Sequence, residues 1–349
     1  MKVMHVLSSR IYSGAEKVVC QIIRSLEGTD IELVYCSPDS DIVRQMLTEQ
    51  GVTYLSIDAL TPGNLKAVIR EQKPDLIHAH DMRASFVSAL CCGKIPLVSH
   101  IHNNAYDARG LSLKSVAYLI AGFRAKHIFW VSRSSYEGYL FHKLFAEKSS
   151  VLYNIIDTDQ IFAKKDLDSE TYDFDVIYVG RLTYQKDPQR LMRVLALLKE
   201  NKPDLKAAVV GAGELEAETK QVCAQLGLEE NVSFLGFQGN PIKMVHDSGA
   251  MLLTSRWEGT PMCAMEAMAL GTPVVSTPSD GMKDLITDGV SGFLAEEDAV
   301  LAQDLLRLVT DGELRSSIAR NAAEKFARIN DAEGYRRIME RCYRQGGTL

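Results

Sequence analysis

The alternation of short apolar runs with amphipathic stretches is the feature that most constrains the fold of this 349-residue chain. In the N-terminal half, strand-like runs recur at 2–7, 31–36, 75–79, 96–101, 126–131 and 150–153. Between them lie segments with helical periodicity, for example 14–27, 64–72, 82–91 and 134–145. Continuously apolar strands are typical of sheets buried on both faces, so the alternation predicts parallel sheets covered by helices.

A polar segment at 164–173 interrupts this pattern and is typical of a linker. The alternation then restarts with strand-like runs at 174–179, 206–210, 232–235, 250–254 and 273–276. The sequence therefore predicts an α/β protein with two doubly wound, Rossmann-like domains, 1–165 and 166–330, followed by a final helix within 331–349. Because ligands bind outside the carboxyl ends of such strands, we expect the site in a central cleft that both domains face.

Composition and charge narrow the class of protein. No apolar run approaches the ~20 residues that span a bilayer, and the first residues lack the features of a signal peptide. The seven cysteines contain no C-x-x-C pair, which argues against a disulfide framework or a zinc site. Residues 1–165 carry 19 Lys and Arg against 16 Asp and Glu, whereas 166–349 carry 20 against 29. The sequence predicts a cytoplasmic protein whose N-terminal half suits an anionic partner.

The strongest local signal is the segment that begins at Trp257 and runs W-E-G-T-P-M-C-A-M-E-A-M-A-L-G-T-P. Thr260 is expected to cap a helix whose first residue is Pro261, and Gly271 to end it. Such a helix N-terminus is a ready phosphate site. Glu258 and Glu266 are placed to accept hydrogen bonds from sugar or ribose hydroxyls.

A second signal follows the strand at 174–179. Gly180 ends the strand, and Arg181 and Lys186 precede a helix that begins near Pro188. A guanidinium and an ammonium so placed could neutralise a departing diphosphate.

Glycines and histidines mark further strand ends. Gly14 follows the first strand and opens a helix, but the G-x-G-x-x-G fingerprint of dinucleotide-binding oxidoreductases is absent there. His80 and His102 end two separate strands and are expected to face the cleft. His78 and His100 lie in the strand interiors and are interpreted as structural residues.

Taken together, these motifs resemble glycosyltransferase family 4, the retaining GT-B enzymes. The resemblance covers nearly the whole chain and includes the E-x7-E element, the Gly-Arg…Lys loop, Gly14-Ala-Glu, the S-H-I-H-N-N stretch, Asn154…Asp157, Gly211-Ala-Gly213-Glu and Asp280-Gly281. Two departures stand out: Ser13 stands where the family often has glycine, and Ile155 where it often has glycine after Asn154.

The resemblance implies a hexosyltransferase that moves a hexose or N-acetylhexosamine from a nucleotide-diphosphate sugar, UDP-sugars favoured, onto a hydroxyl acceptor in bacterial surface polysaccharide or glycolipid synthesis. It implies no cofactor and no metal, and a final helix that packs back on the N-terminal domain. The catalytic residues would be His102, Glu258, Arg181 and Lys186. Donor binding would use Gly14, Arg181, Lys186, Glu258, Gly259, Thr260, Pro261, Met262, Cys263 and Glu266, with His80 and Asn103 on the acceptor side.

Two other functions stay open at the level of the sequence. A metal-dependent GT-A transferase would need a D-x-D pair, and such pairs occur in or beside the linker, at Asp157/Asp159, Asp166/Asp168 and Asp173/Asp175. A non-catalytic sugar-nucleotide-binding protein would share the same donor site. No nucleic-acid partner is expected.

The segment 111–123, followed by Arg124 and Lys126, combines apolar and basic residues. It is typical either of an ordinary core-packing helix or of a helix that rests on lipid at the inner face of the cell membrane, where a lipid-linked acceptor would lie.

Overall fold

The structure, a computed structural model, describes residues 1–102 and 106–349. The chain divides into two compact units: unit 1 comprises Met1–Ile155 and Asp331–Leu349, and unit 2 comprises Ile156–Asn330. The candidate Asn103 lies outside the described residues.

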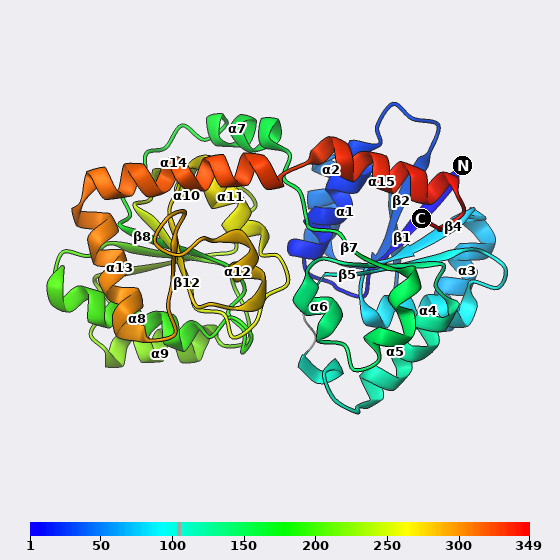
Figure 1. Cartoon of the computed structure of the whole chain (residues 1–349), viewed down its shortest axis with the longest axis horizontal. Helices are drawn as coiled ribbons and strands as arrows, with labels where there is room; N and C mark the ends of the chain where they lie inside the picture. The colour runs from blue at the N-terminus through cyan, green and yellow to red at the C-terminus, as the bar shows by residue number, and fades with distance from the viewer. Residues whose placement is uncertain (103–105) are drawn as a thin grey trace. The chain divides into compact units, whose positions relative to one another are not determined.

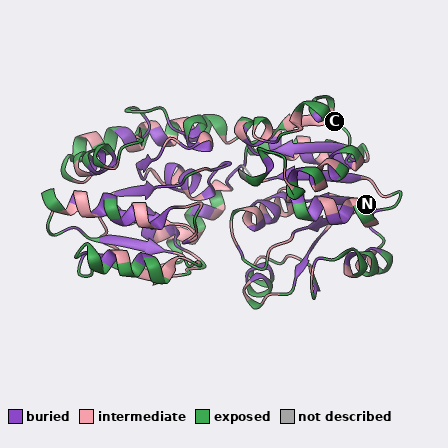
Figure 2. Ribbon diagram, turned by 90° about the horizontal axis from the view of Figure 1, so that it is seen from below, coloured by how far each residue is buried: buried purple, intermediate pink, exposed green. Residues whose placement is uncertain are grey.

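Unit 1 is built on a seven-stranded sheet with the order β3-β2-β1-β4-β5-β6-β7. All its described pairings are parallel. The central strands are buried throughout, and Figure 2 shows them as ribbons of buried residues between helices whose outer faces are exposed. The strands are β1 (Lys2–Val6), β2 (Glu32–Pro38), β3 (Tyr54–Ile57), β4 (Leu76–Ala79), β5 (Leu97–Ile101), β6 (His127–Trp130) and β7 (Ser149–Val151).

Helices cover both faces of this sheet. Those labelled α4 and α5 lie on one side in Figure 1, and α1, α2 and α15 lie on the other, where α15 contacts α1. The helices of unit 1 are α1 (Gly14–Ser25), α2 (Asp41–Glu49), α3 (Pro62–Gln72), α4 (Met82–Cys91), α5 (Leu113–Arg124), α6 (Arg133–Glu137) and α15 (Ala332–Arg344), with 3-10 turns at Tyr106–Ala108 and His142–Lys148.

Unit 2 is built on a six-stranded sheet with the order β10-β9-β8-β11-β12-β13. Its described pairings are also parallel, so the prediction of two parallel-sheet α/β domains is confirmed. The strands are β8 (Val176–Val179), β9 (Ala207–Val210), β10 (Val232–Gly236), β11 (Ala250–Leu253), β12 (Val274–Ser276) and β13 (Phe293–Leu294). The helices are α7 (Thr158–Asp166), α8 (Pro188–Asn201), α9 (Glu216–Gln225), α10 (Ile242–Asp247), α11 (Met262–Leu270), α12 (Asp280–Leu285), α13 (Asp298–Thr310) and α14 (Gly312–Ile329).

The boundary between the units lies at 155/156, earlier than the predicted 165/166. The reason is α7, which occupies part of the expected linker. The Asp157 side chain caps this helix by accepting a 3.0 Å hydrogen bond from the Gln160 N–H, and α7 packs on α10 and α11. Its residues therefore belong to the core of unit 2.

Strands β3 and β13 have no counterpart among the predicted runs. Both are short edge strands, and the residues of β3 are mostly only half-buried, so β3 lacks a continuous apolar run. Among the described residues, no helix combines the length and the apolar character that crossing a membrane requires.

Candidate functional site

The loop that follows β8 carries the predicted Arg181 and Lys186 and is held by close backbone packing. A Cβ on Gly180 would lie 2.8 Å from the Tyr178 hydroxyl, which donates a 2.8 Å hydrogen bond to the Arg181 carbonyl. A Cβ on Gly211, whose φ is +134°, would lie 1.9 Å from the Gly180 carbonyl oxygen. Glycine is therefore required at Gly211, where a Cβ would meet the backbone, and a Cβ at Gly180 would displace the Tyr178 side chain that holds the loop.

An ion pair joins two of the predicted residues across unit 2. The Lys186 ammonium donates to Glu258 Oε1 at 2.5 Å, and the Ser255 hydroxyl donates to the same oxygen at 2.5 Å. The side chains of Lys186 and Glu258 are only 13% and 5% exposed, so the pair is largely removed from water. Charged hydrogen bonds in such surroundings are stronger than on an open surface, because solvent screens them less.

The loops that carry Lys186 and Glu258 are tied together by backbone-directed hydrogen bonds. The Arg256 N–H donates to the Gln185 carbonyl at 2.8 Å, and the Gln185 side-chain amide donates to the Trp257 carbonyl at 2.9 Å. The Thr254 hydroxyl donates toward the carbonyl oxygens of Lys186 and Asp187, at 3.2 and 3.0 Å. The two loops therefore form one frame, and the ammonium and the carboxylate occupy fixed positions within it.

Asp187 is the strained residue of this frame. Its φ of 47° lies in the left-handed region, which non-glycine residues rarely adopt. Its carboxylate accepts hydrogen bonds from the Arg190 N–H, as the cap of α8, and from Arg256 at 2.8 Å. Backbone strain of this kind persists where surrounding contacts over-determine it, and it clusters at functional sites.

The N-terminus of α11 lies beside Glu258 in the sequence and differs by one residue from the prediction. The helix begins at Met262 with Pro261 as its N-cap, so Thr260 is not the cap and Pro261 is not the first helical residue. The N-cap residue Pro261 makes no side-chain capping hydrogen bond, and Gly271 ends the helix at a φ of 73°, as predicted. The positive end of the helix dipole at this N-terminus favours an anion.

Two further features shape this end of α11. Glu266, on the first turns of the helix, is 4% exposed, and Gly259 and Thr260 are buried as well. A Cβ on Gly281, at the start of α12, would lie 1.5 Å from the Gly259 carbonyl oxygen. Only glycine therefore allows α12 to approach the Glu258–Gly259 loop so closely.

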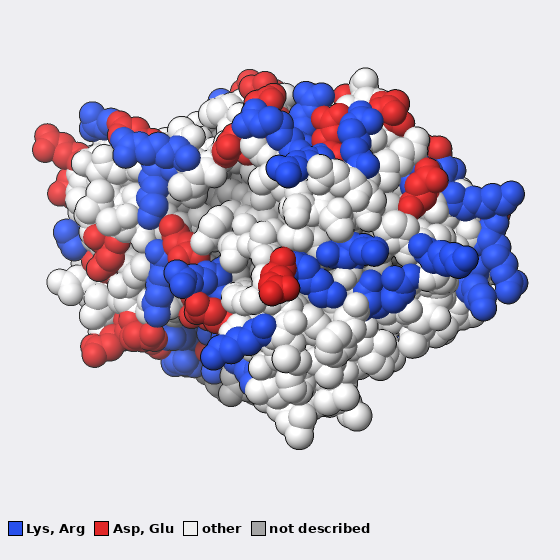
Figure 3. Space-filling view, turned by 45° about the vertical axis from the view of Figure 1, so that its right-hand side comes forward, with Lys and Arg blue, Asp and Glu red and all other residues white. Residues whose placement is uncertain are grey.

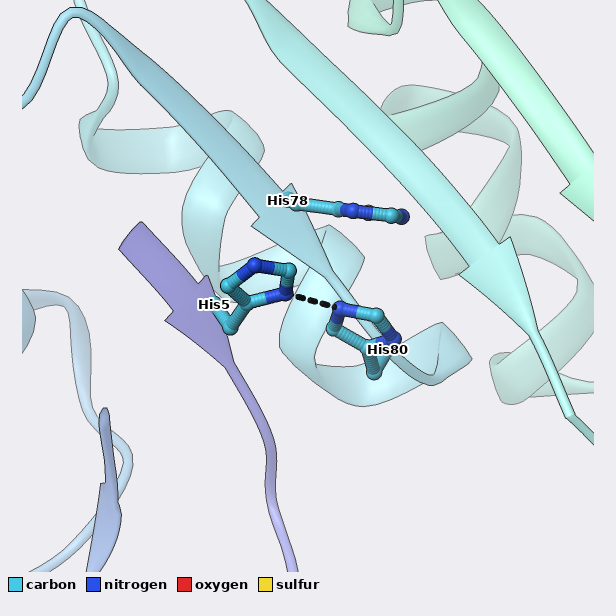
Figure 4. Close-up of side chains that lie close together, drawn as sticks. All are labelled: His5, His78 and His80. Carbon is cyan, nitrogen blue, oxygen red and sulfur yellow. Dashed lines mark hydrogen bonds between the residues drawn. The ribbon is translucent and has the colours of Figure 1, made fainter. Parts of the chain in front are cut away.

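Five of the seven histidines of unit 1 form a cluster of rings on one face of the sheet. His5 and His78 are in register on β1 and β4, and His80 and His102 follow the ends of β4 and β5. His5 Nδ1 lies 2.8 Å from His80 Nε2, and His80 Nδ1 lies 2.8 Å from His102 Nε2. Figure 4 shows the first of these contacts, with the ring of His78 beside it.

Most of these histidines make contacts within unit 1. His80 is 1% exposed, and both of its ring nitrogens lie within hydrogen-bond distance of other histidines. Its role on the acceptor side, which would have to act through these neighbours, stays a prediction. His78 Nδ1 shares a 2.7 Å hydrogen bond with the Tyr343 hydroxyl of α15. The ring of His100 stacks near those of His78 and His102, with ring centroids 5.4 and 4.2 Å apart.

Burial determines the charge of the cluster. Desolvation lowers the pKa of both His5 and His102 from 6.5 to about 3. It also lowers the pKa values of His78, His80 and His100 well below 6.5, and neighbouring imidazoles add to the effect. The imidazoles are therefore neutral at physiological pH.

Gly14 is exposed at the first position of α1, and its helix start is built by its neighbours. The Glu16 carboxylate is 1% exposed and accepts hydrogen bonds from the Ser13 N–H and hydroxyl, both at 2.9 Å. Desolvation raises the pKa of Glu16. The Gly-Ala-Glu turn is therefore a capping box that leaves Gly14 at the surface.

Among residues 1–102 and 106–349, only histidines come together with the spacing of metal ligands. Two triads have ligand atoms within 4.8 Å of one another: His5, His78 and His80, and His80, His100 and His102. No D-x-D pair belongs to such a group in the described ranges. Asp157 instead caps α7, and the Asp173 carboxylate pairs with Lys206 at 2.6 Å.

Sequence reasoning did not identify Ser255, Asp187 or Arg256 as parts of the frame. Ser255 lies three residues before Glu258 and carries a hydroxyl, which is a weak local signal. The contact of Asp187 with Arg256 joins residues 69 positions apart (256 − 187), and no local sequence pattern predicts it.

Comparison with known proteins agrees with this architecture. The family model described as glycosyl transferases group 1 matches residues 159–325, and the model of glycosyltransferase family 4 matches residues 12–160. The UDP-Gal:alpha-D-GlcNAc-diphosphoundecaprenol alpha-1,3-galactosyltransferase of Escherichia coli is 25% identical over 358 residues, covering 93% of this chain and 92% of that protein.

Another relative is similar over about half of its length. The N-acetylgalactosamine-N,N'-diacetylbacillosaminyl-diphospho-undecaprenol 4-alpha-N-acetylgalactosaminyltransferase of Campylobacter jejuni is 32% identical over 192 residues, covering 53% of this chain and 52% of that protein.

Among solved structures, Anabaena HepE in complex with UDP-glucose superposes with a TM-score of 0.86 at 23% identity, covering 99% of this chain and all of that one. This likeness confirms the predicted GT-B fold. The two family models together account for most of both units, and the chain therefore belongs to glycosyltransferase family 4, the group 1 glycosyltransferases.

Proposed function

We propose that this glycosyltransferase moves a hexose or N-acetylhexosamine from a UDP-sugar to a hydroxyl acceptor, with retention of anomeric configuration. The observation that carries the proposal is the buried Lys186–Glu258 pair, 2.5 Å apart, in a rigid frame whose Glu258 loop leads into the start of α11. This arrangement combines a cation, a carboxylate and a helix N-terminus, which suit a phosphate, a sugar hydroxyl and a second phosphate contact.

Each proposed donor contact follows from the chemistry of the group. Arg181 and Lys186 bind the diphosphate, together with the backbone of Thr260, Pro261, Met262 and Cys263 at the start of α11. Glu258 and the Gly259 backbone hold the transferred sugar, and Glu266 accepts hydrogen bonds from the ribose. In unit 1, Gly14 and His102 contact the substrate at the carboxyl edge of their own sheet, with Asn103 on the acceptor side and His80 acting there through its contact with His102.

The reaction needs little from the protein beyond charge stabilisation. The bond between the anomeric carbon and the diphosphate oxygen breaks, and the acceptor oxygen bonds to the same face of that carbon. The acceptor proton passes to a phosphate oxygen. Arg181, Lys186 and the helix dipole stabilise the negative charge on the departing diphosphate, and this is the role that a metal ion performs in other transferases.

The choice of UDP and of a prenyl-diphosphate-linked acceptor is supported by the relatives. HepE was solved with UDP-glucose, and the name of the E. coli relative specifies UDP-galactose and a diphosphoundecaprenol acceptor. The C. jejuni relative also acts on a diphospho-undecaprenol substrate. We therefore propose a place in the synthesis of a bacterial surface polysaccharide or glycolipid, at the inner face of the cell membrane.

An apolar stripe on α5 supports contact with a membrane. Leu113, Val116, Ile120 and Phe123 follow helical spacing and are 93%, 45%, 49% and 64% exposed. Basic residues flank the stripe, among them Lys114 and Lys126. Figure 3 shows a broad uncharged area at the bottom of the molecule, at the height of α5 in Figure 1, with Lys and Arg above it. Apolar and basic groups together favour an anionic lipid surface.

The donor assignment is tested by binding and turnover in EDTA. UDP, GDP, ADP and their sugars are screened by thermal shift, and UDP release is measured with a polyprenyl-diphosphate-sugar acceptor. Lys186→Ala is expected to lower turnover ~100-fold, the size of effect that follows loss of one stabilising group. Lys220→Ala is the matched control, because Lys220 is an exposed lysine of the same unit that pairs with Glu216.

Three outcomes would contradict the assignment. Full activity of Lys186→Ala would remove its leaving-group role, and loss of wild-type activity in EDTA would favour a metal-dependent transferase. Nucleotide-sugar binding without turnover on any acceptor would favour a non-catalytic binding protein.

The membrane proposal is tested by vesicle flotation. The wild type is expected to bind vesicles that contain phosphatidylglycerol, and Leu113→Asp with Phe123→Asp to abolish binding. Leu167→Asp alters another strongly exposed leucine, 81% exposed, in unit 2, and should leave flotation unchanged. Equal binding of all three proteins would refute the role of α5.

A further inference from the structure

The clustered histidines of unit 1 are organised as a hydrogen-bonded chain. His5, His80 and His102 are joined by two nitrogen–nitrogen contacts of 2.8 Å, an ordinary hydrogen-bond distance. His80 is the middle member and uses both ring nitrogens, whereas His5 Nε2 is buried with no partner among the described residues. The chain therefore has a closed end at His5 and leads to His102 at the end of β5.

Neutral imidazoles allow only two proton arrangements in this chain. A neutral ring has one N–H and one bare nitrogen, so His80 must donate one of its bonds and accept the other. Both hydrogen bonds consequently point the same way along the chain. The direction decides whether His102 carries its proton on Nε2 or on Nδ1.

In either direction one end of the chain carries a buried N–H without a partner among the described residues, at His5 Nε2 or at His102 Nδ1, and such groups are rare. The two ends differ in enclosure, because His5 is 0% exposed whereas His102 is only partly buried, at the end of β5. A substrate oxygen can therefore pair with a proton on His102 but not with one on His5, which favours a bare Nε2 on His5. His5 then donates from Nδ1 to His80 Nε2, and His80 donates from Nδ1 to His102 Nε2. His102 must carry its own proton on Nδ1.

We propose that His5 and His80 are positioning residues of the transferase, which hold the His102 ring in one orientation with Nδ1 as a hydrogen-bond donor. The proposal rests on the proposed role of His102 at the substrate site. His102 Nδ1 is buried and has no hydrogen-bond partner among residues 1–102 and 106–349. Its N–H suits an oxygen acceptor, either a sugar hydroxyl or a phosphate oxygen of the donor.

The same rings could instead ligate a metal, since two overlapping triads have suitable spacing. Hydrogen bonding fits better for two reasons. Two nitrogens on one tetrahedral zinc ion lie roughly 3.3 Å apart, given metal–nitrogen distances of about 2.0–2.1 Å, whereas the linked pairs are 2.8 Å apart. Both triads consist of histidines only, so no ligand would neutralise the charge of a buried cation.

The experiment compares two variants of equal shape at the middle of the chain. In His80→Asn, the side-chain amide nitrogen takes the place of Nδ1 and can still donate to His102, whereas His80→Leu removes every hydrogen bond. The tautomer of each histidine is measured by long-range 15N–1H NMR on protein labelled with [15N]histidine. His100→Phe is the control, because its ring packs against His102 at 4.2 Å but belongs to neither link of the chain.

We expect a protonated Nδ1 and a bare Nε2 on His102 in the wild type, in His80→Asn and in His100→Phe, and a mixture in His80→Leu. The ratio kcat/KM should be roughly tenfold lower in His80→Leu than in His80→Asn, which corresponds to one hydrogen bond. Thermal stability should be similar in the two variants, since each leaves His5 Nδ1 and one further buried polar atom without a partner, namely His102 Nε2 in His80→Leu and the Asn oxygen in His80→Asn. If His80 only supported the fold, kcat/KM of the two His80 variants would change in parallel with their thermal stability.

A proton on Nε2 of His102 in the wild type would overturn the proposal, as would equal tautomers and activities in the two His80 variants. Stoichiometric zinc, nickel or copper in the purified wild type, lost in His100→Phe, would replace the chain by a metal site. The tautomer is measured without substrate, so its outcome is separate from that of the proposed function, which is decided by the turnover of Lys186→Ala, the activity in EDTA and the turnover of bound nucleotide sugar.

Discussion

Acidification should unfold unit 1 well before unit 2, because unit 1 holds the buried neutral histidines. Their pKa values are depressed in the folded protein, so below pH 6.5 the unfolded chain binds more protons than the folded one. The stabilising effect of keeping them neutral is therefore present above pH 6.5 and is lost as the pH falls toward the folded pKa. For His5 and His102 that lower limit is about 3.

The magnitude follows from these two values. A shift from 6.5 to about 3 removes about 2 kcal/mol of unfolding free energy per histidine between pH 7 and pH 5, and about 4 kcal/mol for both. His78, His80 and His100 act in the same direction. Folded domains have total stabilities of roughly 5–15 kcal/mol, so unit 1 loses a large share of its stability by pH 5.

The two tryptophans of the chain allow each unit to be followed separately. Trp130 is fully buried in unit 1, and Trp257 lies in the site loop of unit 2. Urea unfolding is followed by fluorescence at pH 7 and pH 5, in Trp257→Phe for unit 1 and in Trp130→Phe for unit 2. Unit 2 is an internal control, since its single histidine, His246, has a side chain that is 39% exposed.

The urea midpoint of unit 1 should fall steeply between pH 7 and pH 5, and His100→Phe should reduce that fall because it removes one titrating ring. An unchanged midpoint for unit 1 would refute the reasoning. An equal fall in unit 2 would show that the loss arises from general charge repulsion instead.

Three further predictions concern single contacts. Glu258→Gln should tighten UDP binding about tenfold in calorimetry while lowering turnover, because the carboxylate no longer competes with the diphosphate for Lys186; weaker UDP binding would contradict this. Gly281→Ala should destabilise unit 2 by more than about 2 kcal/mol in urea unfolding, since its Cβ would meet the Gly259 carbonyl oxygen at 1.5 Å, and an unchanged midpoint would rule out the close approach. Tyr343→Phe should cost unit 1 about 1–2 kcal/mol by leaving a buried histidine nitrogen unpaired, whereas a neutral effect would mean that water replaces the hydroxyl.

The sequence predicted the two sheets because buried parallel strands leave a signal that is continuous and local. It did not predict β3 or α7, where the edge strand is half-buried and the helix lies in a charged segment. Helix α11 was placed correctly except for its first residue, because Thr260 and Pro261 are both acceptable just before a helix and only the backbone angles decide between them.

The site was less predictable than the fold, because its contacts join distant residues. Strand ends identified Lys186 and Glu258 separately, but their contact spans 72 positions and depends on the order of β8 and β11 in the sheet. The histidines show the same limit. Alternate positions place His78 and His80 on one face, yet the partner of His80 is His5, 75 residues away.

Helix α15 makes unit 1 discontinuous, and this has a consequence for the order of folding. The strands of unit 1 leave the ribosome first, but the helix that covers β1 and β4 and pairs Tyr343 with His78 is synthesised after all of unit 2. Unit 2 is a single uninterrupted segment, so it can complete its fold during translation while unit 1 still lacks α15. The chain is thus organised as a host domain that is closed only after its insert has been made.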